Sequence, residues 1–164
     1  SHAAFAKAIK ACKDAGGKVS LTLSDPFCVE RHRDAFRTMI QDHVDLLFCN
    51  RAEMLSMYQT DDIDAALAQC SQEVETVACT DSENGAHILQ NGAHHHVAAK
   101  PVKIVDATGA GDMFAGAFLW GISEGYNLPT CGAMGNIAAG EIISHIGARA
   151  QADVKKMFND AGLI

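Results

Sequence analysis

The spacing of apolar and polar positions predicts strands and helices in alternation along this chain. Residues 3–15 carry apolar side chains at helical spacing, and Gly16-Gly17 ends the predicted helix. Residues 18–24 alternate and are rich in β-branched side chains, so they predict a strand. The same patterns predict further helices over 29–41, from Asn50 onward, and over 61–72, 112–124, 129–145 and 152–160, with strands over 44–49, 76–80 and 102–105.

A hairpin interrupts this alternation near the middle of the chain. Residues 86–90 and 93–98 flank Asn91-Gly92, a pair that readily adopts the positive φ angles of a tight turn. Short apolar strands that alternate with helices are typical of a mostly parallel sheet covered on both faces by helices. The sequence has no internal repeat, linker or low-complexity segment. It therefore predicts one α/β unit over residues 1–164.

Composition narrows the class of protein. The chain has 164 residues, of which 48% are hydrophobic, and this is enough for one substantial core. The net charge of −7, with no basic run, argues against nucleic acid and anionic membrane surfaces as partners. No apolar stretch reaches the length of a membrane span, and the start does not resemble a signal peptide. The six cysteines form no Cys-x-x-Cys pair and mostly lie in apolar runs, which predicts buried, reduced thiols in a cytoplasmic protein.

The segment 106–112 (DATGAGD) carries the clearest candidate chemistry. It joins the strand predicted over 102–105 to a helix that follows at once. Gly109 and Gly111 flank an alanine, so successive backbone N–H groups can turn toward one point and form an anion cradle. The helix that follows contributes the positive end of its dipole. The segment is thus suited to holding a phosphate group.

Asp112 has two interpretations from the residues alone. A carboxylate at a helix start interacts favourably with the helix dipole and can be a simple cap. A carboxylate beside an anion cradle is also where a base would accept a proton from a hydroxyl that attacks phosphorus. The pattern leaves both roles open.

All seven positions of 106–112 match the carboxy-terminal signature of the PfkB, or ribokinase-like, kinases, and Phe114, Gly116 and Phe118 continue it. The chain resembles this family over nearly its whole length. The resemblance implies a three-layer α/β/α fold with a mostly parallel central sheet. It also implies that Asp112 is the catalytic base and that Gly109, Ala110 and Gly111 form the anion hole. The alternative Gly-x-x-x-x-Gly-Lys phosphate loop does not occur in the sequence.

Two weaker stretches follow the order of the family. Asn50-Arg51-Ala52-Glu53 resembles its Asn-x-x-Glu element, which implies that Asn50 and Glu53 support Mg²⁺ and phosphates; by spacing alone the pair also fits a capping box. Residues 80–85 (TDSENG) resemble its Thr-x-Gly-x-x-Gly nucleotide loop. Thr80 and Gly85 match, but Ser82 replaces the usual glycine, so an ordinary polar turn is the alternative.

The resemblance extends to two further groups of residues. Asn136 lies in a stretch that resembles the helix beside the adenine ring, although tight helix packing explains an Ala- and Gly-rich helix equally well. Asp106, Thr108 and Gly147 match positions at which some family members hold a monovalent cation, which implies a K⁺ site. The histidines at 94–96 suggest a separate metal site. No third ligand with convincing spacing lies near them, so an exposed hairpin is the preferred interpretation.

Members of the family are roughly twice as long, and we expect that the missing amino-terminal half carries the first strands and most acceptor contacts. The resemblance implies an ATP- and Mg²⁺-dependent kinase of a sugar or nucleoside, with the adenosine kinase-like branch slightly favoured. The alternative is a non-catalytic fragment that binds nucleotides or anions and self-associates. A truncated sheet exposes an edge and apolar surface, so we expect a homo-oligomer.

Overall fold

The protein is described by a computed structural model that covers residues 2–164. The chain divides into two compact units. The first unit comprises the residues up to Cys79 together with Leu89–Ala93, and the second comprises Thr80–Ile88 and His94–Ile164. The single α/β unit expected from the sequence stays a prediction.

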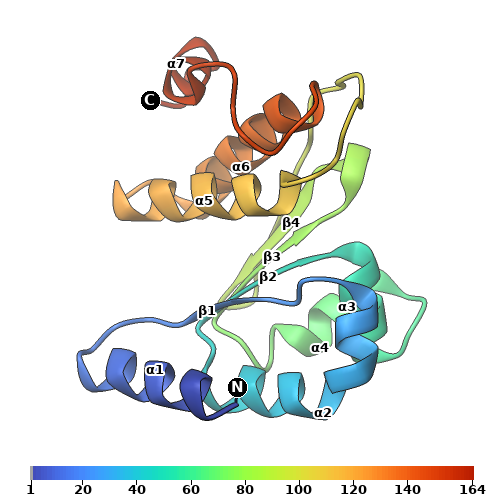
Figure 1. Cartoon of the computed structure of the whole chain (residues 1–164), viewed down its shortest axis with the longest axis vertical. Coiled ribbons are helices and arrows are strands. Elements are labelled where there is room, and N and C mark those ends of the chain that lie inside the picture. The colour runs from blue at the N-terminus through green and yellow to red at the C-terminus, as the bar shows by residue number, and fades with distance from the viewer. Residues whose placement is uncertain (1) are drawn as a thin grey trace. The chain divides into compact units, whose positions relative to one another are not determined.

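The strands and helices follow the predicted order, with one exception (Figure 1). Up to β3 the elements are α1 (His2–Asp14), β1 (Ser20–Thr22), α2 (Pro26–His43), β2 (Leu46–Asn50), α3 (Arg51–Tyr58), α4 (Ile63–Cys70) and β3 (Thr76–Thr80). After β3 they are the 3-10 turn η1 (Ser82–Asn84), β4 (Ala86–Gln90), β5 (Ala93–Val97), α5 (Ala110–Ser123), α6 (Leu128–Ile143) and α7 (Val154–Asp160).

The five strands form one sheet in the order β1-β2-β3-β4-β5. β1 pairs with β2 in parallel, with Ser20 opposite Leu46 and Thr22 opposite Phe48. Since the carboxyl ends of parallel neighbours meet at the same edge, the residues that follow β1 and β2 are brought together there. This alternating α/β architecture with parallel pairing confirms the predicted fold class.

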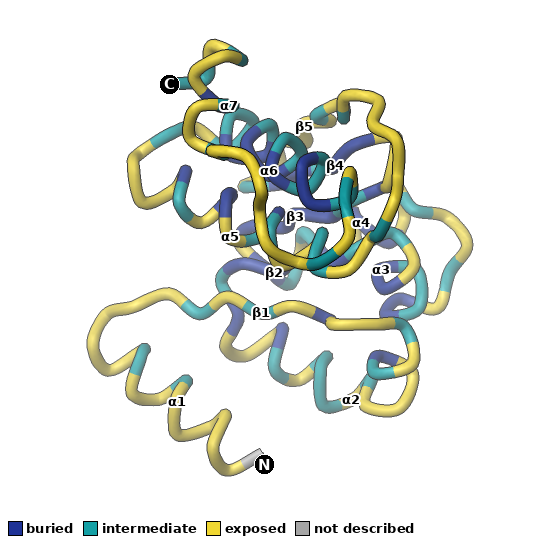
Figure 2. Tube along the Cα trace, turned by 45° about the horizontal axis from the view of Figure 1, so that its top comes forward, coloured by how far each residue is buried: buried dark blue, intermediate teal, exposed yellow. Residues whose placement is uncertain are grey.

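The first unit is built around the apolar strands β2 and β3, which Figure 2 shows as buried. Leu47, Val77 and Cys79 on these strands are fully buried, and side chains from α2, α3 and α4 pack around them. α1 lies outside this core, since nearly all of its residues are exposed (Figure 2). The core therefore holds the strand ends that carry the candidate site residues of this unit.

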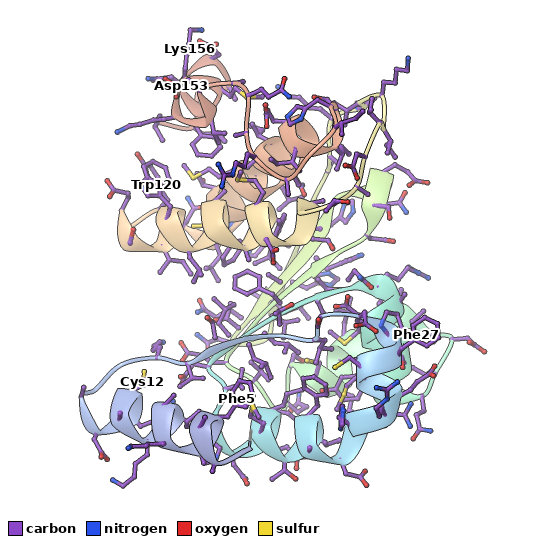
Figure 3. The ribbon with its side chains drawn as sticks, viewed as in Figure 1. Phe5, Cys12, Phe27, Trp120, Asp153 and Lys156 are labelled. Atoms are coloured by element: carbon purple, nitrogen blue, oxygen red, sulfur yellow. The ribbon has the colours of Figure 1, made fainter. Side chains whose placement is uncertain are left out.

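The second unit is centred on the pair α5 and α6, which lie side by side in Figure 1. Gly135 of α6 permits their close approach, because a Cβ there would lie 2.7 Å from the ring of the fully buried Phe114. Trp120 extends from α5 toward α7, where its ring stacks on Phe158 at 5.7 Å between centroids (Figure 3). Ring stacking of this kind fixes α7 on the helix pair.

Two predictions about the segment before α5 are corrected by the structure. Residues 102–105 form no strand; the Val105 amide donates instead to the Ile143 carbonyl at 2.8 Å, at the end of α6. The β-branched side chains there mimic a strand pattern, but Val102 and Ile104 are 44% and 65% exposed. α5 begins at Ala110 rather than at Asp112, because the Met113 amide already bonds the Gly109 carbonyl.

The structure of residues 2–164 also bears on the cysteines and on membrane-spanning helices. Four cysteines are buried and two are partly exposed, and all six carry free thiols in the structure. No helix in this part of the chain has the length and apolarity needed to cross a bilayer.

Asp45 links α1 to the start of β1, and this contact gives a pH prediction. Its carboxylate accepts bonds from Lys13 Nζ and from the Val19 amide, both at 2.6 Å. Burial acts to raise the pKa of Asp45, but the Lys13 and Val19 bonds together lower it below its ordinary value. The stabilisation is therefore present above the unfolded pKa and disappears as the pH falls through the lower folded pKa.

We expect Asp45→Asn to lower the free energy of unfolding by about 1 kcal/mol at pH 7. Urea unfolding at pH 7 and at about pH 3 measures this difference, which should shrink at the lower pH because the carboxylate of the unfolded chain is protonated there and the stabilisation is being lost. The matched control is the exposed Asp14→Asn, for which we expect a smaller effect. An Asp45→Asn effect of equal size at both pH values would contradict this assignment.

Candidate active site

The turn before α5 contains a glycine in a backbone conformation that other residues rarely adopt. Gly109 is the residue before the helix, and its φ of +83° lies in the left-handed region. A Cβ at this position would also lie 2.7 Å from the Cβ of Ala148. Both the backbone conformation and this close contact favour glycine, which explains the first glycine of the motif.

Asp106 fastens this turn to the loop after α6. One of its carboxylate oxygens accepts the Thr108 amide at 2.9 Å, and the other accepts the Gly147 amide at 3.1 Å. Bonds from Thr108 and from the Gly147 amide hold the pKa of Asp106 below its usual range. The three residues predicted for a monovalent cation thus lie together, and the cation itself stays a prediction.

The amides of the predicted anion hole differ in their hydrogen bonding. Ala110 N–H donates to the Ala107 carbonyl at 3.2 Å, closing the turn. In the part of the chain that the structure describes, the amides of Gly109, Gly111 and Asp112 donate to no backbone carbonyl. Unpaired amides at a helix start are the usual donors to an anion. Gly111 and Asp112 can therefore meet an anion without breaking a bond, whereas Ala110 must first release Ala107.

Asp112 lies in the first turn of α5 and is exposed. Gly109 occupies the capping position, so Asp112 is not the N-cap residue. Its carboxylate still interacts favourably with the helix dipole. Over residues 2–164, no hydrogen bond of the Asp112 side chain occupies its oxygens, so they can accept a proton from a hydroxyl placed against this turn.

Asn50 and Glu53 form a complete capping box at the start of α3. The Asn50 side chain accepts the Glu53 amide at 2.9 Å, while the Asn50 amide and Nδ2 donate to the two Glu53 oxygens at 3.0 and 2.6 Å. Glu53 is only 4% exposed. Burial raises the pKa of its carboxyl, the Asn50 amide lowers it, and nearby Asp25 raises it further. A cation near Asp25 and Glu53 would offset this unfavourable charge.

The loop after β3 keeps a glycine-like path although Ser82 replaces the glycine of the family pattern. Ser82 has a φ of +49°, in the left-handed region. Gly85 has a φ of +100°, and a Cβ there would lie 2.1 Å from the Val97 carbonyl oxygen. The Asp81 amide closes the loop by donating to the Gly85 carbonyl at 2.7 Å. Thr80 ends β3 directly before this loop.

Because Ser82 adopts a conformation that suits glycine, we expect Ser82→Gly to raise the free energy of unfolding by about 0.5 kcal/mol. Relief of the left-handed strain stabilises the folded state, and the larger conformational entropy of glycine in the unfolded chain offsets part of that gain. Urea denaturation measures it. Ser82→Ala is the matched control because it removes the hydroxyl but retains the strain. An equal or larger gain in the alanine variant would show that the backbone conformation is not the cause.

Asn136 uses its side chain to tie α6 to the end of β5. Its Nδ2 donates to the Val97 carbonyl at 2.8 Å. Gly132, one turn earlier, brings the helix within contact of Ile88 and Val97. Tight packing therefore accounts for the small residues of α6, while the predicted place of Asn136 beside an adenine ring stays a prediction.

The histidines of the hairpin gather around a residue that the sequence did not single out. His87 on β4 lies 2.9 Å from His94, nitrogen to nitrogen, and its ring centroid is 5.1 Å from that of His96. β5 is exposed at all three of its histidines, as the hairpin interpretation expects. Across residues 2–164, no group of three His, Cys, Asp or Glu side chains is arranged to hold a metal ion.

Glu141 is another residue that sequence reasoning missed. It is the one charged residue in the sequence of α6, and this isolation was the available signal. The side chain is 7% exposed and accepts the amides of Gln151 and Ala152 at 2.8 and 2.9 Å. These bonds shape the loop that meets Asp106 and Gly109. A hollow of about 470 Å³ lies along that loop, lined by residues 146–151.

With this geometry in view, comparison with known families identifies the chain. The model of the pfkB family of carbohydrate kinases matches residues 1–155. The chain belongs to the pfkB family of carbohydrate kinases. The resemblance expected from the 106–112 motif is thereby confirmed, and this pfkB chain contains the glycine turn and acid described above.

Three relatives illustrate the range of the family. A cytidine kinase of Thermococcus kodakarensis is 34% identical over 121 residues, covering 71% of this chain and 43% of the relative. The structure of a probable sugar kinase from Rhizobium etli CFN 42 has a TM-score of 0.90 at 43% identity, over 93% of this chain and 47% of that one. The structure of adenosine kinase from Sinorhizobium meliloti has a TM-score of 0.91 at 36% identity, over 94% and 48%. The chain thus has the ribokinase-like fold and spans about half the length of these relatives.

Proposed function

We propose that this pfkB chain is the nucleotide-binding and catalytic half of a kinase that transfers phosphate from ATP to an alcohol group of a sugar or nucleoside. The observation that carries the proposal is the turn at Gly109–Asp112, where unpaired amides and an exposed carboxylate lie at one helix start. Phosphoryl transfer depends mainly on positioning, charge neutralisation and a base for the attacking hydroxyl. The turn supplies both charge neutralisation and the base from adjacent residues.

Each step of the reaction has a candidate residue. Asp112 accepts the proton from the hydroxyl as its oxygen bonds to the γ-phosphorus, and the bond from that phosphorus to the bridging oxygen of ADP breaks. The amides at Gly109–Asp112 stabilise the charge on the transferred group. Ala110 takes part once its bond to Ala107 opens.

ATP and Mg²⁺ are the cofactors that membership of a kinase family implies. Mg²⁺ prefers oxygen ligands and retains several waters, so a buried acid such as Glu53, with Asn50 beside it, would hold it through water rather than directly. Thr80, Ser82 and Gly85 form the proposed nucleotide loop, with Asn136 beside the base. A K⁺ ion at Asp106, Thr108 and Gly147 would suit their oxygen atoms.

The relatives and one sequence element narrow the class of acceptor. A cytidine kinase and an adenosine kinase are among these relatives. Their names support a nucleoside as the acceptor, in addition to a sugar. The slight preference for the adenosine kinase-like branch rests on the lack of a long polar insert and on the Asp25-Pro26-Phe27 element at the start of α2, and the match to an adenosine kinase agrees with it.

A direct assay tests the proposal. The chain is incubated with Mg-ATP and a panel of ribose, fructose, adenosine and cytidine, and the phosphorylated product is measured by mass spectrometry. We expect one acceptor to be phosphorylated, and Asp112→Asn to form about 10³-fold less product while ATP still binds. Equal inactivity of the wild type and the Asn variant, with ATP bound by both, would reject the kinase function for this chain.

The second candidate function is a non-catalytic nucleotide-binding fragment that self-associates, and the exposed apolar residues favour it. Phe27 is 76% exposed, and Figure 3 shows it at the outside of its unit. Ile146 is 80% exposed in the second unit. Turnover in the assay above separates the two functions. Light scattering at several concentrations tests self-association, for which a homo-oligomer is expected and a monomer at high concentration would count against it.

A further inference from the structure

Glu141 occupies a position that is unfavourable for a carboxylate. It is almost fully buried in the last turn of α6, two residues before the helix ends at Ile143. Burial removes the water that solvates the charge, and the helix carboxyl end carries a partial negative charge. An acid is tolerated there only where several donors compensate for both effects.

Three donors converge on one oxygen of Glu141. The Gln151 and Ala152 amides donate to Oε1 at 2.8 and 2.9 Å, and His145 Nε2 lies 3.1 Å from the same oxygen. Burial acts to raise the pKa of Glu141, but the bonds from Ala152, Gln151 and His145 together bring it below the ordinary value. The ionised side chain therefore holds both ends of the segment 145–152.

The middle of this segment contacts the turn that precedes α5. Gly147 donates its amide to Asp106, and the Cβ of Ala148 lies 2.7 Å from the position that a Cβ on Gly109 would take. A contiguous series of hydrogen bonds and one van der Waals contact thus leads from Glu141, through residues 145–152, to the glycine turn. No other acid of α6 can make this connection, because Glu141 is the one acid in that helix.

We propose that Glu141 is a positioning residue for phosphoryl transfer. It holds residues 145–152 against Asp106 and Gly109, and so sets the direction of the amides that bind the transferred group. This inference rests on the proposed function of the turn. Glu141 itself acts only through the segment, so removing it should misalign the reacting groups rather than remove one of them.

The second carboxylate oxygen makes glutamine an informative replacement. Oε2 of Glu141 is buried and has no hydrogen-bond partner among residues 2–164. In Glu141→Gln, the amide oxygen can keep all three donors at the Oε1 position, and the NH₂ group occupies the Oε2 position. Glu141→Ala removes the acceptor altogether. The exposed Glu124→Ala, at the end of α5, is the matched control.

Amide hydrogen exchange, followed by NMR on the full 164-residue chain, tests the inference without requiring turnover. In Glu141→Ala we expect exchange to be about 10-fold faster at Gly147 and Thr108, as well as at the directly bonded Gln151 and Ala152. Glu141→Gln should restore most of the protection, and Glu124→Ala should change none of it. Unchanged exchange at Gly147 and Thr108 in a folded alanine variant would overturn the inference.

Two further measurements keep the test decisive. If Glu141→Ala does not fold, His145→Ala is measured instead, because it removes a single donor to Glu141. We then expect about threefold faster exchange at Gly147. An unchanged exchange rate at Gly147 would overturn the inference. Where turnover is measurable, kcat of Glu141→Ala should fall about 10-fold at unchanged KM for ATP and recover in Glu141→Gln. If the wild type and Asp112→Asn are equally inactive, the proposed function fails, and the exchange data still decide the role of Glu141.

Discussion

Asp112→Asn is expected to lower kcat by about 10³-fold, because the amide cannot accept the proton of the attacking hydroxyl. The side chain keeps its size, and the exposed position in the first turn of α5 makes little demand on packing. Folding and ATP affinity should therefore stay close to those of the wild type. The loss is measured by steady-state kinetics on the acceptor identified in the panel, with ATP binding followed by calorimetry.

The matched control for Asp112→Asn is Asp153→Asn, which changes a carboxylate at the start of α7 in the same way. Asp153 caps its helix through the Lys156 amide, so the control removes a comparable charge from a helix start. We expect its kcat to stay within about twofold of the wild type. A similar fall in both variants would indicate a general effect of charge loss and contradict the base assignment.

Gly109→Ala is expected to cost about 3 kcal/mol of stability and about 100-fold in kcat. Its left-handed φ of +83° strains any side chain, and the new Cβ would lie 2.7 Å from Ala148. Relief of this contact must displace the loop or the turn, and a displacement of that kind misaligns the anion-binding amides. Thermal unfolding and the kinetic assay measure the two effects.

Gly125→Ala separates the two causes. Gly125 has the same φ of +83°, but a Cβ there meets nothing within 4 Å. We expect a cost of about 1 kcal/mol from the backbone conformation alone and an unchanged kcat. If Gly109→Ala were no more costly than Gly125→Ala, the close packing of Ala148 against the turn would not constrain the site.

Most of the fold could be predicted because its signals are local. The capping residues Asp62 and Asn50 mark helix starts, and Asn91-Gly92 marks the hairpin turn. The strand predicted over 102–105 was wrong because a β-branched run predicts extended backbone but does not supply a neighbouring strand. The Val105 amide bonds to the end of α6 instead, a long-range contact that no local pattern contains.

The local conformation of the candidate site was predictable where the family motif is contiguous. The glycine turn has the positive φ that its sequence requires, since only glycine adopts it at low cost. Glu141 was not predicted, because its partners Gln151 and Ala152 lie ten and eleven residues further on and bond through backbone amides, which have no sequence signature. The capping box of Asn50 and Glu53 was foreseen as an alternative, and the structure forms it.

The central claim, that the turn before α5 binds the phosphate to be transferred, is tested most directly by assigning the backbone amide resonances and adding Mg-ATP. We predict that the amides of Gly109, Gly111 and Asp112 show saturable shifts, among the largest in the second unit, at the same ATP concentration that saturates the loop at Thr80–Gly85. Saturation of that loop with the three amides unmoved would contradict the claim.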